Sequence, residues 1–349
     1  MPLSTVWLRC HRGGNHLERR TDIMDRGLPD DNTVKAVLAL AGRAPSVHNI
    51  QPWRWRIADR SVHLYFDETR ALPTTDPDQR DLVLSCGAAL HHLSVASAAM
   101  GWATVVHRLP NPDDPNHLAA VTLVAHRATS LEIEMSAAIH QRRTDRRHYT
   151  SWPIPPGYRG LLTERASASG AVLRPVRDAD KDVLVAAART AARVHAADPE
   201  YRFELAVWSG RHGSLDGVPA RNTPSVRAGD ELPARAFAAP ELADPAKERD
   251  YAELLMLGTS ADDRVSRLRA GEALSAVLLT ATNVGLASCA LTEPLEIPAQ
   301  RERIRSDMLN GTCYPHAFIR VGWAPTSNEP IPATPRRPVE DLLYPADVD

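Results

Sequence analysis

Apolar and polar positions along the chain predict a mixture of helices and strands. Apolar residues at helical spacing follow four capping residues, Asp30 to Thr33, which predicts a helix over 34–41. Further helices are expected over 82–100, 130–140, 158–169, 178–196, 262–284 and 298–309. Alternating or short apolar runs predict strands over 53–57, 62–66, 102–106, 120–124, 171–175, 254–258 and 316–321.

The order of these elements occurs twice. A helix and a strand lead to a helix of small residues that ends at glycine, and another strand follows. Ser85 to Trp102 carries this pattern in the first part of the chain, and Ala270 to Leu286 carries it in the second. The pattern indicates an internal duplication, although two alanine-rich helices would also resemble each other through composition alone.

The predicted organisation has two halves and two less regular segments. The halves are assigned to residues 24–128 and 129–349. Residues 1–23 lack a regular pattern and are expected to be a disordered extension or the product of an upstream start codon. Residues 209–248 form a glycine- and proline-containing insertion, and long irregular segments of this kind are often functional lids.

Composition excludes several classes of protein. The 349 residues are 43% apolar, which is enough for a large core, and the net charge of -2 argues against nucleic acid or anionic membrane as a partner. No apolar run in the sequence reaches the ~20 residues of a membrane span. The four cysteines are far apart, which disfavours a zinc site or a disulfide framework and fits the cytoplasm.

The stretch from Pro45 to Trp53 joins a predicted helix to a predicted strand. The prolines at its ends restrict the backbone, and Ser46, His48, Asn49 and Gln51 supply donors and acceptors between them. Such a turn can hold a polar ligand. It can equally be a corner whose side chains satisfy their own backbone, and the residues alone leave both alternatives open.

Two groups of arginines are candidates for binding a phosphate group. Residues 142–147 read Arg-Arg-Thr-Asp-Arg-Arg, and Arg336 and Arg337 lie between prolines near the end of the sequence. Guanidinium groups donate paired hydrogen bonds to phosphate, and Arg142 and Arg146 would share one face of a helix. The alternative is a solvated run of charges at a helix end, paired with Asp145.

Five motifs, taken in order, resemble the FMN-dependent nitroreductase family, in particular its fused, two-half Acg-like branch. The motifs are Pro45 to Trp53, Ser85 to Ala89, Arg142 to Arg147, Gly285 to Pro294, and Arg336-Arg337. The resemblance covers most of residues 30–345. It implies an α+β nitroreductase-like fold in which two fused, pseudo-symmetric halves take the place of the family's homodimer. It also implies one complete FMN site, because each half carries a different part of the motif set.

The resemblance further implies the residues of that site. Arg142, Thr144, Arg146, Arg336 and Arg337 would bind the phosphate or ribityl chain of FMN from the second half. Pro45, Ser46 and Asn49 would contribute from the first half, and the backbone around Leu291 and Thr292 would lie near flavin N5. No catalytic acid or base and no metal ligand is assigned, and Cys86 is expected to be a buried small residue.

The expected function is that of an FMN-binding oxidoreductase of nitroreductase type. It would pass reducing equivalents from NAD(P)H, through the flavin, to a nitroaromatic, a quinone or a similar acceptor. The alternative is a protein that sequesters FMN beneath a lid formed by residues 209–248, with little turnover. Because both halves lie in one chain, we expect a monomer or a secondary dimer formed through other surfaces.

Overall fold

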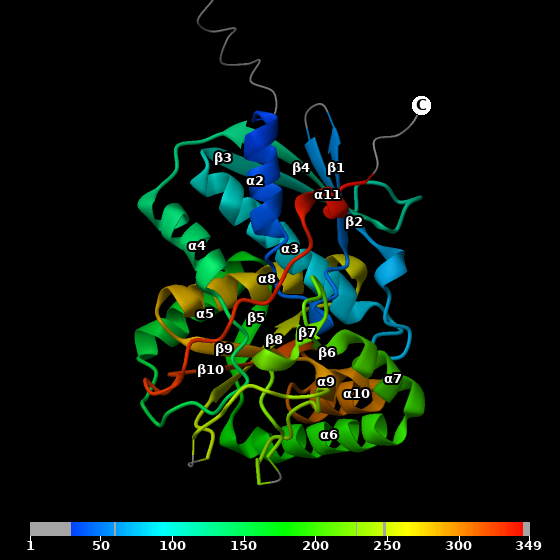
Figure 1. The fold of residues 1–349 in the computed structure, drawn as a ribbon, viewed down its shortest axis with the longest axis vertical. Helices are drawn as coiled ribbons and strands as arrows, with labels where there is room; N and C mark the ends of the chain where they lie inside the picture. The colour runs from blue at the N-terminus through cyan, green and yellow to red at the C-terminus, as the bar shows by residue number, and fades with distance from the viewer. Residues whose placement is uncertain (1–28, 59–60, 228, 247–248, 345–349) are drawn as a thin grey trace, which may run out of the picture.

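The computed structural model describes residues 29–58, 61–227, 229–246 and 249–344, and its frame is a pair of four-stranded antiparallel sheets (Figure 1). The first sheet contains β1 (Trp53–Ala58), β2 (Ser61–Phe66), β3 (Trp102–Arg108) and β4 (His117–Ala125), in the order β1-β2-β4-β3. The second contains β5 (Val172–Pro175), β8 (Glu253–Thr259), β9 (Ala287–Leu291) and β10 (Tyr314–Gly322), in the order β5-β8-β10-β9. The two sheets therefore share one topology, and the extension expected over 1–23 lies outside the described residues.

Each sheet has a long helix inserted at the same point of its topology. Helix α3 (Arg80–Ala99) connects β2 to β3, and α8 (Arg264–Asn283) connects β8 to β9. Within the described residues, the other helices of four or more residues are α2 (Asp31–Ala41), α4 (Ser130–Gln141), α5 (Pro156–Ala168), α6 (Asp178–Ala197), α7 (Pro199–Trp208), α9 (Glu293–Glu296), α10 (Pro298–Asp307) and α11 (Val339–Leu342). The predicted α+β fold with two fused, pseudo-symmetric halves is thus confirmed, whereas the division at residues 128 and 129 stays a prediction.

Helices α3 and α8 cross at two glycines. A Cβ atom added to Gly87 would lie 2.0 Å from the carbonyl oxygen of Leu268, and one added to Gly271 would lie 2.0 Å from the carbonyl oxygen of Leu84. The two contacts mirror each other, which is the relation expected of two halves that pack about a pseudo-twofold axis. Only residues without a side chain allow the two backbones to approach this closely.

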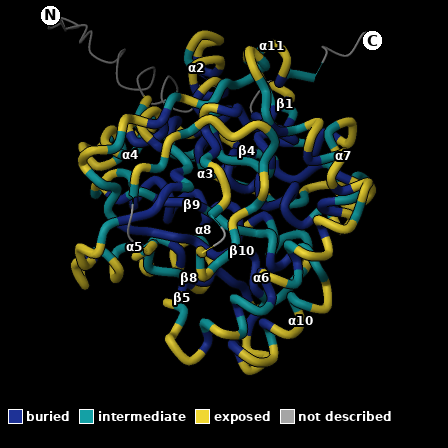
Figure 2. Tube along the Cα trace, turned by 60° about the horizontal axis from the view of Figure 1, so that its bottom comes forward, coloured by how far each residue is buried: buried dark blue, intermediate teal, exposed yellow. Residues whose placement is uncertain are grey.

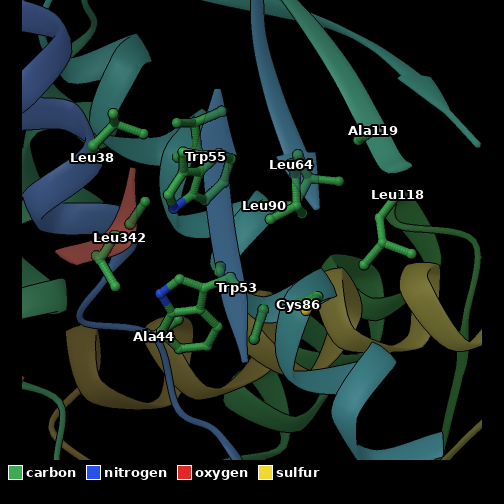
Figure 3. Packing of buried hydrophobic residues seen from close by; sticks show 14 of the residues in the cluster. Leu38, Ala44, Trp53, Trp55, Leu64, Cys86, Leu90, Leu118, Ala119 and Leu342 are labelled. Atoms are coloured by element: carbon green, nitrogen blue, oxygen red, sulfur yellow. The ribbon is translucent and has the colours of Figure 1, made fainter. Parts of the chain in front are cut away.

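The first half has its core between its sheet, α2 and α3. Trp53 and Trp55 of β1 are fully buried there, beside Leu38 of α2 and Leu90 of α3 (Figure 3). Leu342 packs into the same core from the far end of the chain. The polar side of β1 and β2 includes Arg54, Arg56 and His63, in keeping with the period-2 alternation that predicted these strands.

The second sheet is buried on both faces. Leu255 and Leu257 of β8 pack towards α8 and α5, whereas Met256 packs on the opposite side with residues of α6 and α10. The strands β8, β9 and β10 accordingly run through the buried interior of the molecule (Figure 2). This arrangement explains why β8 is a continuous apolar run rather than an alternating one.

Helix α3 is, within the described residues, the helix long and apolar enough to match a membrane span. Its most apolar stretch is 72% buried inside the protein, where it packs against α8. The apolar character of α3 is therefore that of a core helix.

The segment after β10 returns across the molecule to the first half (Figure 1, red). We call residues 323–343 the C-terminal arm. Leu343 forms a parallel bridge with Trp55, and the amide of Tyr344 donates a 2.8 Å hydrogen bond to the carbonyl of Trp55. The arm thus ties the last part of the described chain to the first sheet, and it carries Arg336 past the end of α2.

Several elements were absent from the prediction, among them the short helices α9 and α11, helix α7 and strand β9. Helix α7 begins directly after α6, at Pro199, and its Asp198 cap accepts hydrogen bonds from the amides of Glu200 and Tyr201. Strand β9 has the sequence Ala-Ser-Cys-Ala-Leu, which lacks the β-branched residues that mark strands. The described residues of 209–248 are largely irregular, as expected, and contain the short elements β6 (Ser209–Arg211), β7 (Val218–Pro219) and η3 (Ala220–Asn222).

Replacing Gly271 by alanine should destabilise the fold by about 3 kcal/mol, the upper part of the range for overpacked cores. The new methyl group would press on the backbone of α3, which cannot move without separating the halves. Chemical denaturation measures the effect. The matched control is Gly160→Ala in α5, where no atom lies within 4 Å of the added Cβ and a gain of about 0.5–1 kcal/mol is expected. A Gly271→Ala protein as stable as the parent would contradict the close crossing.

Candidate functional site

A cavity of about 1090 Å³ lies between the two halves and the insertion. It is larger than most small-molecule pockets, which span roughly 300–1,000 Å³. The first half contributes the turn before β1 and the start of α3, and the second half contributes the segment after α4 and the end of β9. The residues from these parts are Pro45, Ser46, Val47, His48, Asp81, Leu84, Ser85, Thr144, Arg146, Cys289, Ala290, Leu291, Thr292 and Glu293.

The turn before β1 has an uncommon backbone. His48, Asn49 and Gln51 have φ values of 47°, 53° and 54°, in the left-handed region that non-glycine residues rarely adopt. The hydroxyl of Ser85 accepts a 3.1 Å hydrogen bond from the amide of Val47, and Ser46 Oγ accepts one of the same length from the amide of Gln51. Side chains on α3 and in the turn therefore hold the turn in this conformation.

Asn49 holds protein segments together rather than lining the cavity. Its Nδ2 donates to the carbonyls of Gly217 in the insertion, at 2.9 Å, and of Pro335 in the C-terminal arm, at 3.3 Å. Gln51 acts similarly, because its Nε2 donates to Leu215 and its Oε1 accepts from the amide of Arg337. The turn is thus the point at which the first half, the insertion and the arm meet.

Four arginines gather beside one end of the cavity, and we call them the arginine cluster: Arg43, Arg142, Arg143 and Arg336. Arg336 donates to the carbonyls of Arg43 and Ala44, each at 3.2 Å, next to Pro45 of the cavity wall. Arg142 Nη1 lies 3.3 Å from the hydroxyl of Thr144, another wall residue. The cluster therefore borders the cavity at two points, one from each half.

The charges of this cluster are not compensated by the protein. Among the described residues, no carboxylate lies within 4.0 Å of any of the four guanidinium groups. The Nε atoms of Arg43, Arg142 and Arg336 are buried without a hydrogen-bond partner. Burial, followed by the charges of Arg143 and Arg43, lowers the pKa of Arg142 to about 10. Burial and the charges of Arg142 and Arg43 lower the pKa of Arg336 to about 9.

Arg146 and Arg337 occupy different surroundings. Arg146 lines the cavity with its guanidinium group 4.8 Å from the ring centre of Phe237, a residue of the insertion. Arg337 lies in a separate small pocket with Arg54 and Tyr344, and its Nη2 donates to the carbonyl of Asp341. The neighbouring arginines of the Arg336-Arg337 pair therefore point to different sites.

The helical spacing inferred for Arg142 and Arg146 is wrong. Helix α4 ends at Gln141, and Arg142 is its C-cap with φ -55° and ψ 128°, so the chain leaves the helix before the arginine run begins. Arg147, rather than Arg142 or Arg146, pairs with Asp145 at 2.9 Å. This ion pair holds the segment after α4 in place. Arg142 is left to join the arginine cluster, and Arg146 is left to line the cavity.

The ten residues predicted for the site fall into three groups. Six of them line the cavity: Pro45, Ser46, Thr144, Arg146, Leu291 and Thr292. Arg142 and Arg336 belong to the adjoining arginine cluster. Asn49 and Arg337 face other parts of the protein, as described above. Their assignment to a cofactor stays a prediction, but eight of the ten meet at one place although they come from both ends of the chain.

Sequence reasoning missed several residues of the site. Arg43 lies two residues before Pro45 of the turn and belongs to the cluster, but a single arginine at the end of a predicted helix gives no sign of charge clustering. Asp81 and Ser85 lie on the cavity face of α3, and the apolar pattern of this helix predicted its burial without indicating that face. Arg235 and Phe237 come from the irregular insertion, where no periodicity indicates which side chains face inward.

The insertion closes one side of the cavity through a buried ion pair. Arg235 pairs with Glu296 and donates a 2.5 Å hydrogen bond to the hydroxyl of Tyr201. His48 lies 3.3 Å from the same guanidinium group, and burial, followed by the charge of Arg235, lowers its pKa well below the usual value. His48 is therefore neutral at physiological pH, and it presents a neutral polar ring to the cavity.

Known proteins similar to this chain identify its family. No family model matches the chain. A Mycobacterium tuberculosis protein named "Putative NAD(P)H nitroreductase Rv3131" is 46% identical over 323 residues, which cover 92% of this chain and 93% of that protein. Another from the same organism, named "Putative NAD(P)H nitroreductase acg", is 37% identical over 317 residues, covering 90% and 96%. The chain belongs to the nitroreductase family, among its Acg-like members.

Solved structures of nitroreductases also align with this chain. A nitroreductase in complex with FMN from Desulfovibrio desulfuricans has 17% identity and a TM-score of 0.37, and the alignment covers 62% of this chain and 98% of that one. An FMN- and NADPH-dependent nitroreductase, NfnB, from a Sphingopyxis strain has 14% identity and a TM-score of 0.38, with coverage of 61% and 98%.

Replacing Arg142 by methionine should stabilise the ligand-free protein by about 1–3 kcal/mol. The pKa of Arg142 is lower in the folded than in the unfolded chain, so its charge opposes folding at every pH below about 10. Thermal and urea denaturation at pH 7 measure the difference. The control is Arg303→Met, an exposed arginine of α10, for which a change below about 0.5 kcal/mol is expected. Destabilisation of Arg142→Met would show that the cluster is compensated.

Proposed function

We propose that this protein binds one FMN in the cavity between its halves and acts as an oxidoreductase of nitroreductase type. The observation that carries the proposal is the arginine cluster, in which buried charges border a large cavity without any described carboxylate nearby. A phosphate dianion would compensate these charges and accept hydrogen bonds from the orphaned Nε atoms. The membership in the nitroreductase family supports FMN as the molecule that carries this phosphate.

The residues present suit the different parts of FMN. Arg142 and Arg336 would bind the phosphate together with Arg43, and Thr144 would lie near the phosphate or the ribityl chain. Pro45 and Ser46 would face the cofactor from the first half. Arg146, with Leu291 and Thr292, would lie along the flavin. Bound FMN would supply two-electron chemistry, accepting reducing equivalents and passing them to a nitroaromatic, a quinone or a similar acceptor.

The protein's part in this reaction is binding and exclusion of water. The Arg235–Glu296 pair and the contacts of residues 215–217 with the turn keep the insertion over the cavity. Phe237 covers Arg146, so its guanidinium group would interact with the cofactor away from solvent, where a charge acts more strongly. The names of the two M. tuberculosis relatives support NAD(P)H as the electron donor.

One chain supplies the whole site, so we propose that a monomer is sufficient. The turn and α3 come from the first half, and the arginines after α4 and in the C-terminal arm come from the second. A dimer through other surfaces would leave this cavity unchanged.

The second candidate function is sequestration of FMN. It is favoured by the same insertion, because Asp216 pairs with Arg70, the amide of Gly217 donates to Asn49, and Arg235 is bound to Glu296. With the insertion held in place, a nicotinamide ring would have little access to the flavin face. The two functions share one binding site and differ in whether a second molecule can enter.

FMN titration of the FMN-free protein should show one site per chain, followed by visible absorbance or flavin fluorescence. Arg142→Met should weaken FMN binding at least tenfold, about 1.4 kcal/mol, because one charge-assisted donor to the phosphate is lost. Riboflavin provides the matched ligand, since it lacks the phosphate and should bind the parent and the variant equally. A parent protein that binds no FMN would refute the proposed function.

Anaerobic mixing with NADPH or NADH should bleach the bound flavin within seconds if the protein is an oxidoreductase. Stopped-flow absorbance measures the rate, and dithionite provides a positive control for reducible flavin. Bound flavin that dithionite reduces but neither nicotinamide does would instead support sequestration.

A further inference from the structure

The first turn of α3 places a carboxyl group on the cavity wall. Asp81, Leu84 and Ser85 are spaced so that they share one face of the helix, and all three line the cavity. Asp81 is only 3% exposed, and its Oδ2 has no hydrogen-bond partner among the described residues. A buried carboxylate oxygen without a donor is costly, which favours the protonated acid.

Asp81 has a second buried acid as a neighbour. Asp76 caps α3, accepting hydrogen bonds from the amides of Arg80 at 2.8 Å and Leu82 at 2.9 Å. Burial, followed by the negative charge of Asp81, raises the pKa of Asp76 to about 7. The pKa of Asp81 is also raised by burial, against the opposing charge of Arg80. Two coupled carboxyls of this kind retain a proton near neutral pH.

The cations around Asp81 are already engaged with other carboxylates. Arg80 lies 3.5 Å from Asp262, and Arg301 of α10 lies 3.3 Å from Asp78. Arg235 of the insertion pairs with Glu296 of α9. The groups that act most strongly on the pair of acids are Arg80, Arg235, Arg301 and Glu296, together with the hydroxyl of Thr292. Each of these arginines is therefore paired with a carboxylate other than Asp81.

Glu293 lines the same end of the cavity, but its environment differs. Its Oε1 lies 3.2 Å from His195 Nδ1, and although burial opposes ionisation, the charges of Arg235 and His195 lower its pKa. Glu293 is thus an ionised partner of the insertion's arginine. Two cavity acids whose pKa values are shifted in opposite directions are suited to different roles, charge stabilisation for Glu293 and proton donation for Asp81.

We propose that Asp81 is the acid that protonates the electron acceptor in this cavity. The inference rests on the proposed function, because reduced flavin is the source of the electrons. A quinone acceptor would receive two electrons and one proton as a hydride equivalent, and the second proton would pass from the Asp81 carboxyl to a quinone oxygen. The O–H bond of Asp81 breaks, an O–H bond of the hydroquinone forms, and the Asp81 carboxylate regains a proton from water through the pair with Asp76.

The first test measures how fast reduced protein transfers electrons to 1,4-naphthoquinone. The FMN-loaded parent and Asp81→Asn are photoreduced anaerobically with EDTA as the electron donor and mixed with the quinone in a stopped-flow instrument from pH 5 to 9. The parent rate should fall as the pH rises through about 7. Asp81→Asn should be at least tenfold slower than the parent at pH 6, and its rate should show no such fall with pH. Glu272→Gln, a buried acid paired with Arg108 outside the cavity, is the matched control and should keep the parent profile.

The second test does not use the cofactor. Infrared titration of the FMN-free protein should show a protonated-carboxyl band that disappears around pH 7 in the parent. The band should move to lower pH in Asp81→Asn, because the charge that raises the pKa of Asp76 is absent. In the quinone reaction, Asp76→Asn should shift the pH at which the rate falls. At pH 6 it should keep a higher rate than Asp81→Asn, since Asp76 does not line the cavity.

The outcomes separate this inference from the proposed function. A parent that binds no FMN would refute the function, whereas the infrared titration would still examine the pair of acids. If Asp81→Asn binds FMN and keeps the parent rate and pH profile, the assignment of Asp81 is overturned. Should Asp81→Asn fail to fold, an unchanged pH step in Asp76→Asn would overturn it instead.

Discussion

The glycine crossing of α3 and α8 is the contact on which the rest of the structure depends. Gly87 and Gly271 let two helix backbones meet where any side chain would collide with a carbonyl oxygen. Because each helix is inserted at the same point of its own sheet, this one contact sets the position of both halves. The start of α3 and the end of β9 are thereby brought to a common cavity, and each half supplies a part that the other lacks.

The site itself opposes folding, and the packed interior must offset that cost. Arg142 and Arg336 are held with lowered pKa values beside each other and next to the cavity, while Asp81 on the cavity wall and its buried neighbour Asp76 have raised pKa values. Neither the arginine cluster nor Asp81 has a dedicated partner of opposite charge among the described residues. Such uncompensated groups are typical of sites in which binding or reaction supplies the missing partner.

Local sequence patterns predicted the repeated elements, whereas most residues of the proposed site were assigned through the family resemblance. Small residues at helical spacing marked α3 and α8, and Pro45 with Ser46 marked the turn. The pairing of Arg142 with Arg336 followed only from the family resemblance, since nearly 200 residues separate them. Arg43, Asp81 and Arg235 could not be found in this way, because their roles arise from tertiary contacts that no periodicity encodes. The end of α4 at Gln141 agrees with the helix predicted over 130–140, whereas the shared helical face expected of Arg142 and Arg146 does not form.

The course of the C-terminal arm also determines when the site can form during synthesis. Arg336 and the bridge between Leu343 and Trp55 belong to residues that leave the ribosome after all strands of both sheets. A nascent chain that has already formed its two sheets would still lack one side of the anion-binding end. Cofactor capture would therefore be one of the last events of biogenesis, and a chain released early would carry a folded body that is unable to retain FMN.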